Sequence, residues 1–349
     1  MKFLNKKSMK TLILPPLGAL YGVLTRTHAR LYEQGTFKSA KLDRPVISVG
    51  NITVGGTGKT PMVEWVSRTL ANAGKRVCVL TRGYKRTSPN QRVLVSDGQQ
   101  VFSNPAEAGD EPYLLANNLK EVAAVISDAD RFSAGREAIK HLRTDCFVLD
   151  DGFQHFRLSR SLNIVMIDAT DPWGGGQMIP AGRLREPLVG LKRADCVVLT
   201  RCDQVESIET VRSKLAKLSG DRPVFTSRMV TTDVKALGSS SDTSSKLESI
   251  GAFCAIGNPT SFFTQLRRGG YKPVFEKAFT DHYNYTQEDV DMLARAAQRD
   301  GARALLTTAK DAVKLQHLQF SLPCLYLEIE IEIDNEDELR RLVLTAAKV

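Results

Sequence analysis

The residues most able to do chemistry form one glycine-rich run, Thr53-Val-Gly-Gly-Thr-Gly-Lys-Thr60. An apolar segment, 45–50, precedes the run and predicts a short buried strand, while 61–70 follows it and predicts a helix. Glycines let backbone N–H groups turn toward phosphate oxygens, and a helix N-terminus adds the positive end of its dipole. In that setting Lys59 would reach the β- and γ-phosphates of a nucleotide, and the Thr60 hydroxyl would bind Mg²⁺. The run therefore predicts a phosphate-binding loop.

One position departs from the usual G-x-x-x-x-G-K-[ST] pattern, because Thr53 stands where the first glycine is expected. We expect Gly55 and Gly56 to give the backbone its freedom instead. A purely structural turn before a helix is the alternative, but the Gly-Lys-Thr register and both flanking segments favour nucleotide binding. The predicted nucleotide-binding residues are Thr53, Val54, Gly55, Gly56, Thr57, Gly58, Lys59 and Thr60.

A second candidate lies at the end of another apolar strand, where residues 146–149 are followed by Asp150 and Asp151. An acid at the end of a strand downstream of a phosphate-binding loop is the Walker B arrangement, whose carboxylate holds Mg²⁺ directly or through water. Such a strand is weak evidence alone, but it gains weight beside the loop. We predict Thr60, Asp150 and Asp151 as the metal ligands.

Two shorter segments place charged residues where catalysis could use them. Asp110 and Glu111 follow Gly109 at the predicted start of a helix, where acids also serve simply to satisfy the helix dipole. His282 lies beside Asp281 in a loop and is the histidine best placed for chemistry, although a lone histidine is more often structural.

Arginines form the third type of candidate. Arg185 and Glu186 lie in a loop framed by Gly and Pro, 180–187, and such a loop suits the binding of anionic groups. A surface loop held by its own salt bridges is the alternative. Arg131 lies on the helix predicted after the strand at 123–127.

Alternating strands and helices must position these residues. Strands are predicted at 45–50, 76–81, 123–127, 146–149, 163–168 and 194–200, and a second strand–helix series begins at 253. We therefore predict an α/β protein with a parallel sheet flanked by helices, of the P-loop NTPase type, and a smaller second α/β lobe. The expected parts are an N-terminal segment (1–44), a P-loop core (45–235), a polar linker (236–248) and a C-terminal lobe (249–349).

Positive charge is concentrated at the N-terminus. Residues 1–44 hold nine lysines and arginines against two acids, and so carry +7 of the net charge of +9. A nucleic-acid-binding protein would more often spread basic residues over a folded face, so we expect no nucleic-acid partner. The six cysteines are scattered without a C-x-x-C pair, which argues against disulfides and a zinc site and fits a reducing compartment.

The apolar run at 11–24 lies between these basic residues. It is too short for a confident membrane span, which takes about 20 residues, and Pro15 and Pro16 interrupt it. No cleavage-site pattern follows, which argues against a signal peptide. We predict an amphipathic or shallowly inserted anchor on an anionic membrane surface. A helix packed on the soluble core is the alternative.

Together, the motifs resemble those of the tetraacyldisaccharide 4′-kinase family, the lipid A 4′-kinases of Gram-negative bacteria. The resemblance runs from the N-terminal segment to near the C-terminus, and Thr53 is also the family's form of the loop. Its most specific segments are Leu149-Asp-Asp-Gly-Phe-Gln-His155 and Gly182-Arg-Leu-Arg-Glu-Pro187. The other matching segments are Gly50–Pro61, Thr81–Tyr84, Gly109–Glu111 and Phe279–His282.

The resemblance implies transfer of the γ-phosphate of ATP, with Mg²⁺, to the 4′-hydroxyl of a tetraacylated glucosamine disaccharide 1-phosphate. It implies an enzyme at the cytoplasmic face of the inner membrane, with no obligate protein partner evident. It also implies that Asp110 is the base, that His282 assists it, and that Lys59 binds the transferring phosphate. Glu111, Arg131, Arg185 and Glu186 match further positions that contact substrate or phosphate.

Two other functions stay open on the residues alone. One is a P-loop kinase of a soluble small molecule, against which the basic, apolar N-terminus argues. The other is a P-loop ATPase switch that acts through a partner and phosphorylates no lipid.

Overall fold

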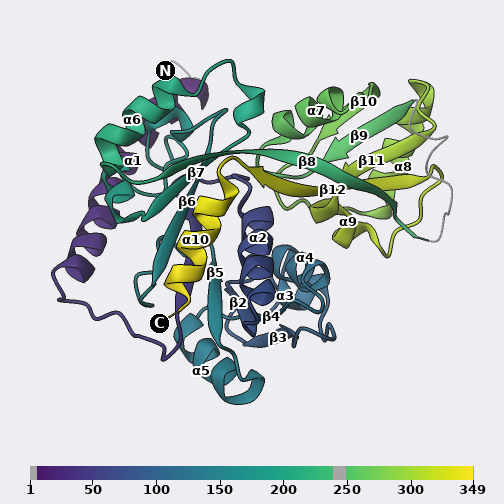
Figure 1. Ribbon diagram of the computed structural model, residues 1–349. Coiled ribbons are helices and arrows are strands. Elements are labelled where there is room, and N and C mark those ends of the chain that lie inside the picture. The colour runs from purple at the N-terminus through teal and green to yellow at the C-terminus, as the bar shows by residue number, and fades with distance from the viewer. Residues whose placement is uncertain (1–5, 239–248, 349) are drawn as a thin grey trace. The chain divides into compact units, whose positions relative to one another are not determined.

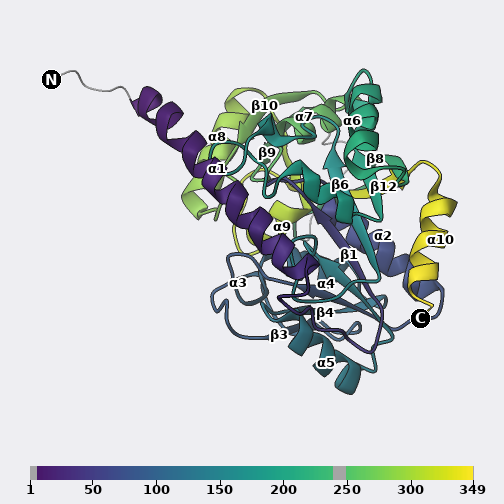
Figure 2. The ribbon, with the colours of Figure 1, turned by 90° about the vertical axis from the view of Figure 1, so that its left-hand side faces the viewer.

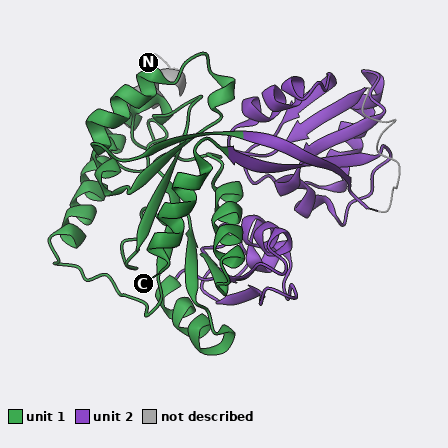
Figure 3. Ribbon diagram, viewed as in Figure 1, with its two compact units in different colours: residues 1–80, 130–228, 333–349 green, residues 81–129, 229–332 purple. Residues whose placement is uncertain are grey.

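The computed structural model describes residues 6–238 and 249–348 (Figure 1, and Figure 2 in a view turned by 90°). The chain forms two compact units (Figure 3). Unit 1 comprises residues 1–80, 130–228 and 333–349, and unit 2 comprises residues 81–129 and 229–332. Each unit is therefore assembled from segments that are distant in sequence.

Unit 1 is built on a parallel sheet in the order β8-β7-β6-β1-β5-β2. Strands β1, β2, β5 and β7 are buried at every residue, as expected for near-continuous apolar runs covered on both faces. Because the strands are parallel, their carboxyl ends meet at one edge, where α/β sheets place their ligands. The strands are β1 (Val46–Asn51), β2 (Val77–Thr81), β5 (Cys146–Asp150), β6 (Leu162–Asp168), β7 (Cys196–Thr200) and β8 (Val224–Ala236), of which residues 224–228 belong to unit 1 and the rest to unit 2.

Helix α2 begins directly after the glycine-rich run and packs on β1 and β5. Its inward-facing residues Met62, Val63, Val66 and Leu70 follow the helical period and are buried. Helix α10 packs on α2, and Trp65 Nε1 donates a hydrogen bond to Glu336 Oε1 at 2.9 Å. The helices of unit 1 are α1 (Lys6–Glu33), α2 (Lys59–Asn72), α5 (Arg131–Leu142), α6 (Glu209–Ser219) and α10 (Glu336–Ala346), with short 3-10 turns η1 (Gly174–Gly176), η2 (Leu188–Arg193) and η3 (Cys202–Gln204).

Helix α1 is one long helix at the N-terminal end of unit 1 (Figure 2). The two prolines of its apolar run lie inside it, so it continues through residues that cannot donate backbone hydrogen bonds. Its C-terminal end is fixed by rings, because Tyr32 stacks on Phe156 at 5.5 Å and His28 meets the same ring edge-on. In the part of the chain that the structure describes, no helix combines the length and apolar character needed to cross a membrane.

Unit 2 contains a parallel sheet in the order β10-β9-β11-β12 and an antiparallel pair, β3 and β4. Two apolar clusters lie on opposite faces of strand β9, one around Phe253 and Leu293 and the other around Ile250 and Leu266. The strands are β3 (Val93–Ser96), β4 (Ala123–Ser127), β9 (Ile250–Cys254), β10 (Pro273–Ala278), β11 (Ala304–Thr308) and β12 (Cys324–Ile333). The helices are α3 (Pro105–Ala108), α4 (Asp110–Asn118), α7 (Pro259–Arg268), α8 (Gln287–Arg299) and α9 (Ala309–Leu315).

The predicted α/β class, with a large and mostly parallel sheet flanked by helices, is confirmed. The division of the chain differs from the expected boundaries, because 81–129 groups with the C-terminal half and 333–349 groups with the phosphate-binding loop. Contacts between distant segments decide this grouping, and composition does not reveal them. Within the predicted linker, Ala236 ends β8, and 239–248 lies outside the described residues.

Candidate functional site

The glycine-rich run lies at the carboxyl end of β1, and its backbone takes conformations that favour glycine. Gly55 has φ 114° and Gly58 has φ 81°, whereas Gly56 keeps a negative φ. Gly58 is in the left-handed region directly before α2, which begins at Lys59. The turn therefore aims the first N–H groups of α2 at the loop, as a phosphate site requires. Gly55 and Gly56 were expected to give the freedom that a glycine at position 53 would give. Of these two, only Gly55 has a positive φ.

Neighbouring strands hold the loop in place. Asn51 Nδ2 donates to Thr57 Oγ1 at 3.0 Å, and Thr200 Oγ1 donates to the Thr57 carbonyl at 3.2 Å. Thr53 forms an isolated bridge with Leu184, and Val54 N donates to the Arg183 carbonyl at 2.8 Å. The Thr53 position thus serves as an attachment to the segment at 183–184, and Thr57 faces inward rather than toward a ligand.

Lys59, Asp151 and Arg185 form one charged group beside the loop. Arg185 binds Asp151 with two parallel hydrogen bonds of 2.6 and 2.9 Å, and Lys59 Nζ lies 3.5 Å from Asp151 Oδ1. Burial alone would raise the pKa of Asp151, but the positive charges of Lys59 and Arg185 hold it well below its ordinary value. The carboxylate therefore stays ionised and keeps Lys59 in position. A nucleotide phosphate would meet two cations here.

The predicted metal ligands share the same sheet edge. Asp150 is the buried last residue of β5, and Thr60 lies in the first turn of α2. A hydroxyl and a carboxylate are the hard oxygen donors that Mg²⁺ prefers, so these residues fit the ion. Among the described residues, no three His, Cys, Asp or Glu side chains stand together as a metal cluster. Mg²⁺ usually takes several of its ligands from phosphate oxygens and water, so a site with two protein donors suits it.

Glu186 points into the protein rather than toward the glycine-rich run. It is buried, accepts from Arg193 at 2.5 Å, and accepts from Gln154 Nε2 at 2.6 Å. Gln154 also donates to the Asn51 carbonyl at 2.8 Å, and Arg193 lies over the ring of Phe153 at 4.7 Å. This network links the 180–187 loop to the turn after β5. Glu186 thus fixes the loop that carries Arg185, and the surface-loop alternative does not describe it.

Arg131 and His155 lie near each other in unit 1. Arg131 is buried at the start of α5, which Asp130 caps by accepting from Ser133 N. Burial and the nearby charge of Arg131, with smaller contributions from Arg160 and Arg157, lower the pKa of His155 to about 4. His155 is therefore neutral at physiological pH.

This lowered pKa makes stability depend on His155. The folded state resists protonation of His155 until about pH 4, whereas the unfolded chain takes up the proton near pH 6.5. The stabilising contribution is thus complete above pH 6.5 and is lost as the pH falls from there toward 4. We expect the wild type to lose about 2 kcal/mol more than His155→Gln between pH 7 and pH 5. Urea unfolding of both proteins at the two pH values measures this difference, and equal losses would contradict it.

Asp110 and His282 meet in unit 2, although 172 residues separate them. Asp110 begins α4 and His282 lies in the loop after β10, and His282 Nδ1 is 3.3 Å from Asp110 Oδ2. His282 has φ 57°, a left-handed conformation that is uncommon for a residue with a side chain. Its N–H donates to the Ala255 carbonyl at 3.2 Å, and the Tyr84 ring packs edge-on against the imidazole at 5.2 Å. A carboxylate held against an imidazole in this way can accept a proton from an alcohol.

Two lysines on α9 complete this group. Lys310 Nζ lies 2.8 Å from Glu111 Oε1, 3.1 Å from His282 Nε2 and 3.5 Å from Asp281 Oδ1. Lys314, one turn later, lies 3.8 Å from Asp110 Oδ2 and donates to the Tyr283 carbonyl at 2.9 Å. Glu111 therefore binds a lysine of its own unit. No local sequence signal marks Lys310 or Lys314 as part of a site.

The structure thus forms two groups of predicted residues, one in each unit, and each is described by itself. In unit 1, Lys59, Asp151 and Arg185 are in contact, with Thr60 and Asp150 on the same sheet edge. In unit 2, Asp110, Glu111 and His282 are joined through Lys310. Sequence reasoning missed several supporting residues. They are Asn51, Gln154, Arg193 and Thr200 in unit 1, and Lys310 and Lys314 in unit 2.

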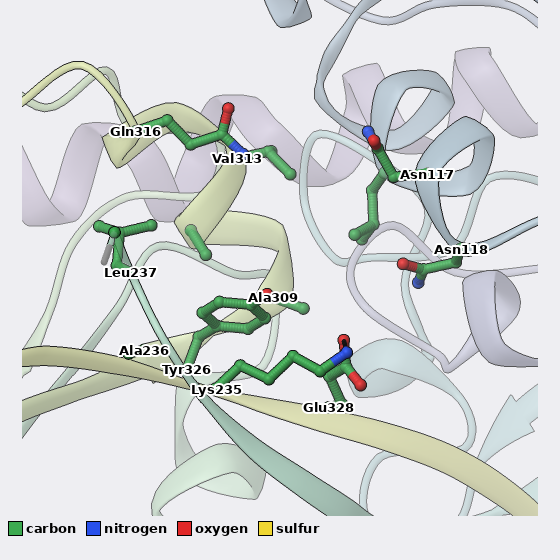
Figure 4. Close-up of a pocket in the computed structure, with 13 residues that line it drawn as sticks. Asn117, Asn118, Lys235, Ala236, Leu237, Ala309, Val313, Gln316, Tyr326 and Glu328 are labelled. Carbon is green, nitrogen blue, oxygen red and sulfur yellow. Dashed lines mark ion pairs between the residues drawn. The ribbon is translucent and has the colours of Figure 1, made fainter. Parts of the chain in front are cut away.

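A cavity of about 510 Å³ lies elsewhere in unit 2 (Figure 4). Asn117 and Asn118 of α4, Val313 and Gln316 at the end of α9, and Tyr326 of β12 line it. One wall is closed by an ion pair, in which Lys235 Nζ lies 2.8 Å from Glu328 Oε1. None of the predicted site residues lines this cavity, so it takes no part in the chemistry inferred below.

The chain is similar to known proteins over almost its whole length. A family model described as Tetraacyldisaccharide-1-P 4'-kinase matches residues 10–348. The tetraacyldisaccharide 4'-kinase of Geobacter metallireducens is 43% identical over 329 residues, which cover 91% of this chain and 92% of that protein. The protein of the same name from Desulfotalea psychrophila is 34% identical over 322 residues, with 92% of each covered. A solved structure of LpxK from Aquifex aeolicus in complex with ATP is 33% identical, with a TM-score of 0.75, and covers 95% of this chain and 98% of that one.

Proposed function

Since this chain belongs to the tetraacyldisaccharide-1-P 4'-kinase family, we infer that it phosphorylates the 4′-hydroxyl of a tetraacylated glucosamine disaccharide 1-phosphate with ATP. The observation that carries this inference is the coexistence of two groups in one chain. One is a phosphate-binding loop with Lys59 and Arg185, and the other is a carboxylate–imidazole pair, Asp110 and His282. A phosphate-binding switch needs only the first group, whereas transfer to an alcohol uses both.

In this reaction the oxygen of the sugar hydroxyl forms a bond to the γ-phosphorus while the bond from that phosphorus to the β,γ-bridging oxygen breaks. The alcohol proton passes to Asp110, and ADP leaves with the bridging oxygen. Phosphoryl transfer requires mainly positioning and neutralisation of charge. Lys59, Arg185 and the loop N–H groups serve those needs. Mg²⁺ bound to Thr60 and Asp150 would neutralise further charge on the phosphates.

A phosphate-transfer assay tests the function directly. We expect labelled γ-phosphate from ATP to appear on a tetraacyl disaccharide 1-phosphate presented in mixed micelles. An acceptor in which the 4′-hydroxyl is replaced by hydrogen is the matched control and should stay unlabelled. Labelling of that control, or release of inorganic phosphate without transfer to lipid, would overturn the assignment and favour a hydrolytic switch.

We further propose that α1 holds the enzyme on the cytoplasmic face of the inner membrane, where its lipid substrate would be presented. Two faces of α1 support this. Gly18 and Gly22 are buried against Met178, and a Cβ atom at Gly18 would lie 2.9 Å from the Met178 carbonyl oxygen. On other faces Leu17, Leu20 and Leu24, spaced by three and four residues, are 47–60% exposed. An amphipathic helix of this kind, with basic residues at its ends, binds anionic lipid surfaces.

Removal of residues 1–24 tests this proposal. We expect the shortened chain to lose sedimentation with vesicles containing anionic lipid while it still binds ATP, because unit 1 keeps its sheet and loop. Leu20→Glu with Leu24→Glu is a milder form of the same test, since both side chains are exposed and their loss opens no core. If either protein sediments as the wild type does, another surface makes the contact.

A further inference from the structure

The ammonium group of Lys310 contacts Nε2 of His282, the ring nitrogen that faces away from Asp110. Lys310 Nζ lies 3.1 Å from His282 Nε2, and His282 Nδ1 lies 3.3 Å from Asp110 Oδ2. We propose that Lys310 is a positioning residue that keeps His282 neutral and fixes its proton on Nδ1, so that the ring donates to Asp110. This inference rests on the proposed function for its kinetic consequences but not for the tautomer itself.

The first step of the argument is that Lys310 can only donate. An ammonium group has three N–H donors and no acceptor. Two carboxylates hold its charge, because Glu111 Oε1 lies at 2.8 Å and Asp281 Oδ1 at 3.5 Å. Burial would lower the pKa of Lys310, but these two carboxylates outweigh it and the pKa is raised. Lys310 is therefore an ammonium ion at neutral pH.

The second step concerns the imidazole. A neutral imidazole has one N–H donor and one acceptor nitrogen, and a protonated ring has two donors. Since Lys310 donates to Nε2, that nitrogen must accept, and the only ring proton lies on Nδ1. A proton on Nε2 would point at the ammonium group of Lys310, whose Nζ lies only 3.1 Å from Nε2. The contact thus disfavours both the other tautomer and the imidazolium form.

The third step is the balance of charges around His282, whose side chain is only 10% exposed. Two carboxylates face the ring, Asp110 at 3.3 Å and Asp281 at 3.9 Å, and both favour protonation. Lys310 at 3.1 Å opposes it, as does the charge of Lys314, which lies 3.8 Å from Asp110. The Tyr84 ring contributes only an edge contact. Removal of Lys310 takes away the cation nearest to the ring and leaves the two carboxylates, which favour the imidazolium form of His282.

Protonation of His282 would weaken Asp110 as a base, because an imidazolium beside a carboxylate stabilises its ionised form. The neutral Nδ1–H form orients Asp110 without that full charge. Lys310 therefore acts through His282, and Lys314, which contacts Asp110 itself, has a different role. The remaining possibilities for Lys310 are a structural contact only or direct binding of substrate phosphate.

The test is Lys310→Met, which keeps most of the side-chain volume but removes the charge and the donors. We expect kcat at neutral pH to fall about tenfold and the acid limb of the pH–kcat profile to move up by about one pH unit or more, with KM for the lipid little changed. A higher pH favours the neutral ring, so most of the turnover should return there. Lys310→Arg retains a permanent positive charge with N–H donors, so its acid limb should stay near that of the wild type.

Nitrogen-15 NMR of labelled histidine supplies a readout that needs neither ATP nor lipid. The chain has five histidines, and His282→Gln identifies the signal of the one concerned. We expect the Nδ1–H tautomer in the wild type, and in Lys310→Met a mixture of tautomers or an imidazolium near neutral pH. Lys235→Met removes the ion pair with Glu328 in the same unit and is the matched control, expected to leave both readouts unchanged.

Three results would overturn the inference. They are an Nε2–H tautomer in the wild type, an unchanged tautomer and pH profile in Lys310→Met, and a raised KM with an unmoved acid limb, which would indicate phosphate binding. If the wild type phosphorylates no disaccharide but still shows the Nδ1–H tautomer that Lys310→Met loses, the proposed function fails and the role of Lys310 stands.

Discussion

Replacement of Asp110 by asparagine is expected to lower turnover by about 10²–10⁴-fold, the range that a positioned general base supplies. A sugar hydroxyl is a poor nucleophile at neutral pH, and Asp110 is the acceptor we assign to its proton. Asparagine keeps the shape of the side chain and can still face His282 Nδ1, 3.3 Å from Asp110 Oδ2, but its amide takes up no proton. The measurement is the steady-state rate of lipid phosphorylation, with ATP and lipid both saturating.

The same variant should stay folded, because the loss of one acid from the first turn of α4 costs about 0.3–1 kcal/mol. Asp97→Asn is the matched control in unit 2. Asp97 accepts from Gln99 N and Gln100 N in an exposed turn, and an asparagine oxygen can accept in the same way. Turnover within a few-fold of the wild type for Asp110→Asn, with normal thermal unfolding, would remove the base assignment.

Replacement of Lys59 by methionine is expected to reduce kcat/KM by about 10²–10³-fold. This is the range found when an enzyme loses one preorganised donor to the charge that develops in the transition state. Methionine is unbranched like lysine but brings no cation to the phosphates. The change also leaves Asp151 with Arg185 as its charged partner, since Lys59 Nζ lies 3.5 Å from the carboxylate. The Asp151 carboxylate then has one cation instead of two to balance its charge, which adds to the loss.

Two measurements separate binding from catalysis here, namely the Kd of ATP with Mg²⁺ and the single-turnover rate at saturating ATP. Lys217→Met, on the exposed face of α6 in the same unit, makes the same change in net charge and serves as the control. Unaltered ATP affinity together with an unaltered single-turnover rate in Lys59→Met would exclude the loop as the nucleotide site.

Local patterns allowed the phosphate-binding loop to be predicted with its register. The strand, the Gly-Lys-Thr segment and the helix follow one another along the chain. The conformation of each depends mainly on its own residues and their close neighbours in sequence. The structure accordingly starts α2 at Lys59 and ends β1 at Asn51. One detail was not predictable, because only Gly55 and Gly58 take a positive φ in this loop.

The supports of the two groups were not predictable from the residues. Gln154 and Glu186 are 32 residues apart, and Lys310 and His282 are 28 apart, so no helical or strand period relates them. Glu186 was expected from family resemblance to contact substrate or phosphate. In the structure it is buried and accepts hydrogen bonds from Arg193 and Gln154, and it thereby supports the loop that carries Arg185.

The grouping of the chain into units shows the same limit. Residues 81–129 begin at the last residue of β2, so a boundary drawn along the sequence places them in the P-loop core. The structure joins them to 229–332, partly because α4 packs on α9. That packing brings Asp110 and Glu111 to Lys310 and Lys314, and it depends on side chains about 200 residues apart.

By itself, the sequence determined the α/β class, the phosphate-binding loop and the carboxylates at the end of the following strand, because such features are recorded in the order of neighbouring residues. Through its motifs it also indicated the family. Only the tertiary structure decided which charges meet: Asp151 with Lys59 and Arg185, and His282 between Asp110 and Lys310. The physical reason is that protonation and charge balance depend on distances of about 3–4 Å, which packing sets and sequence separation does not.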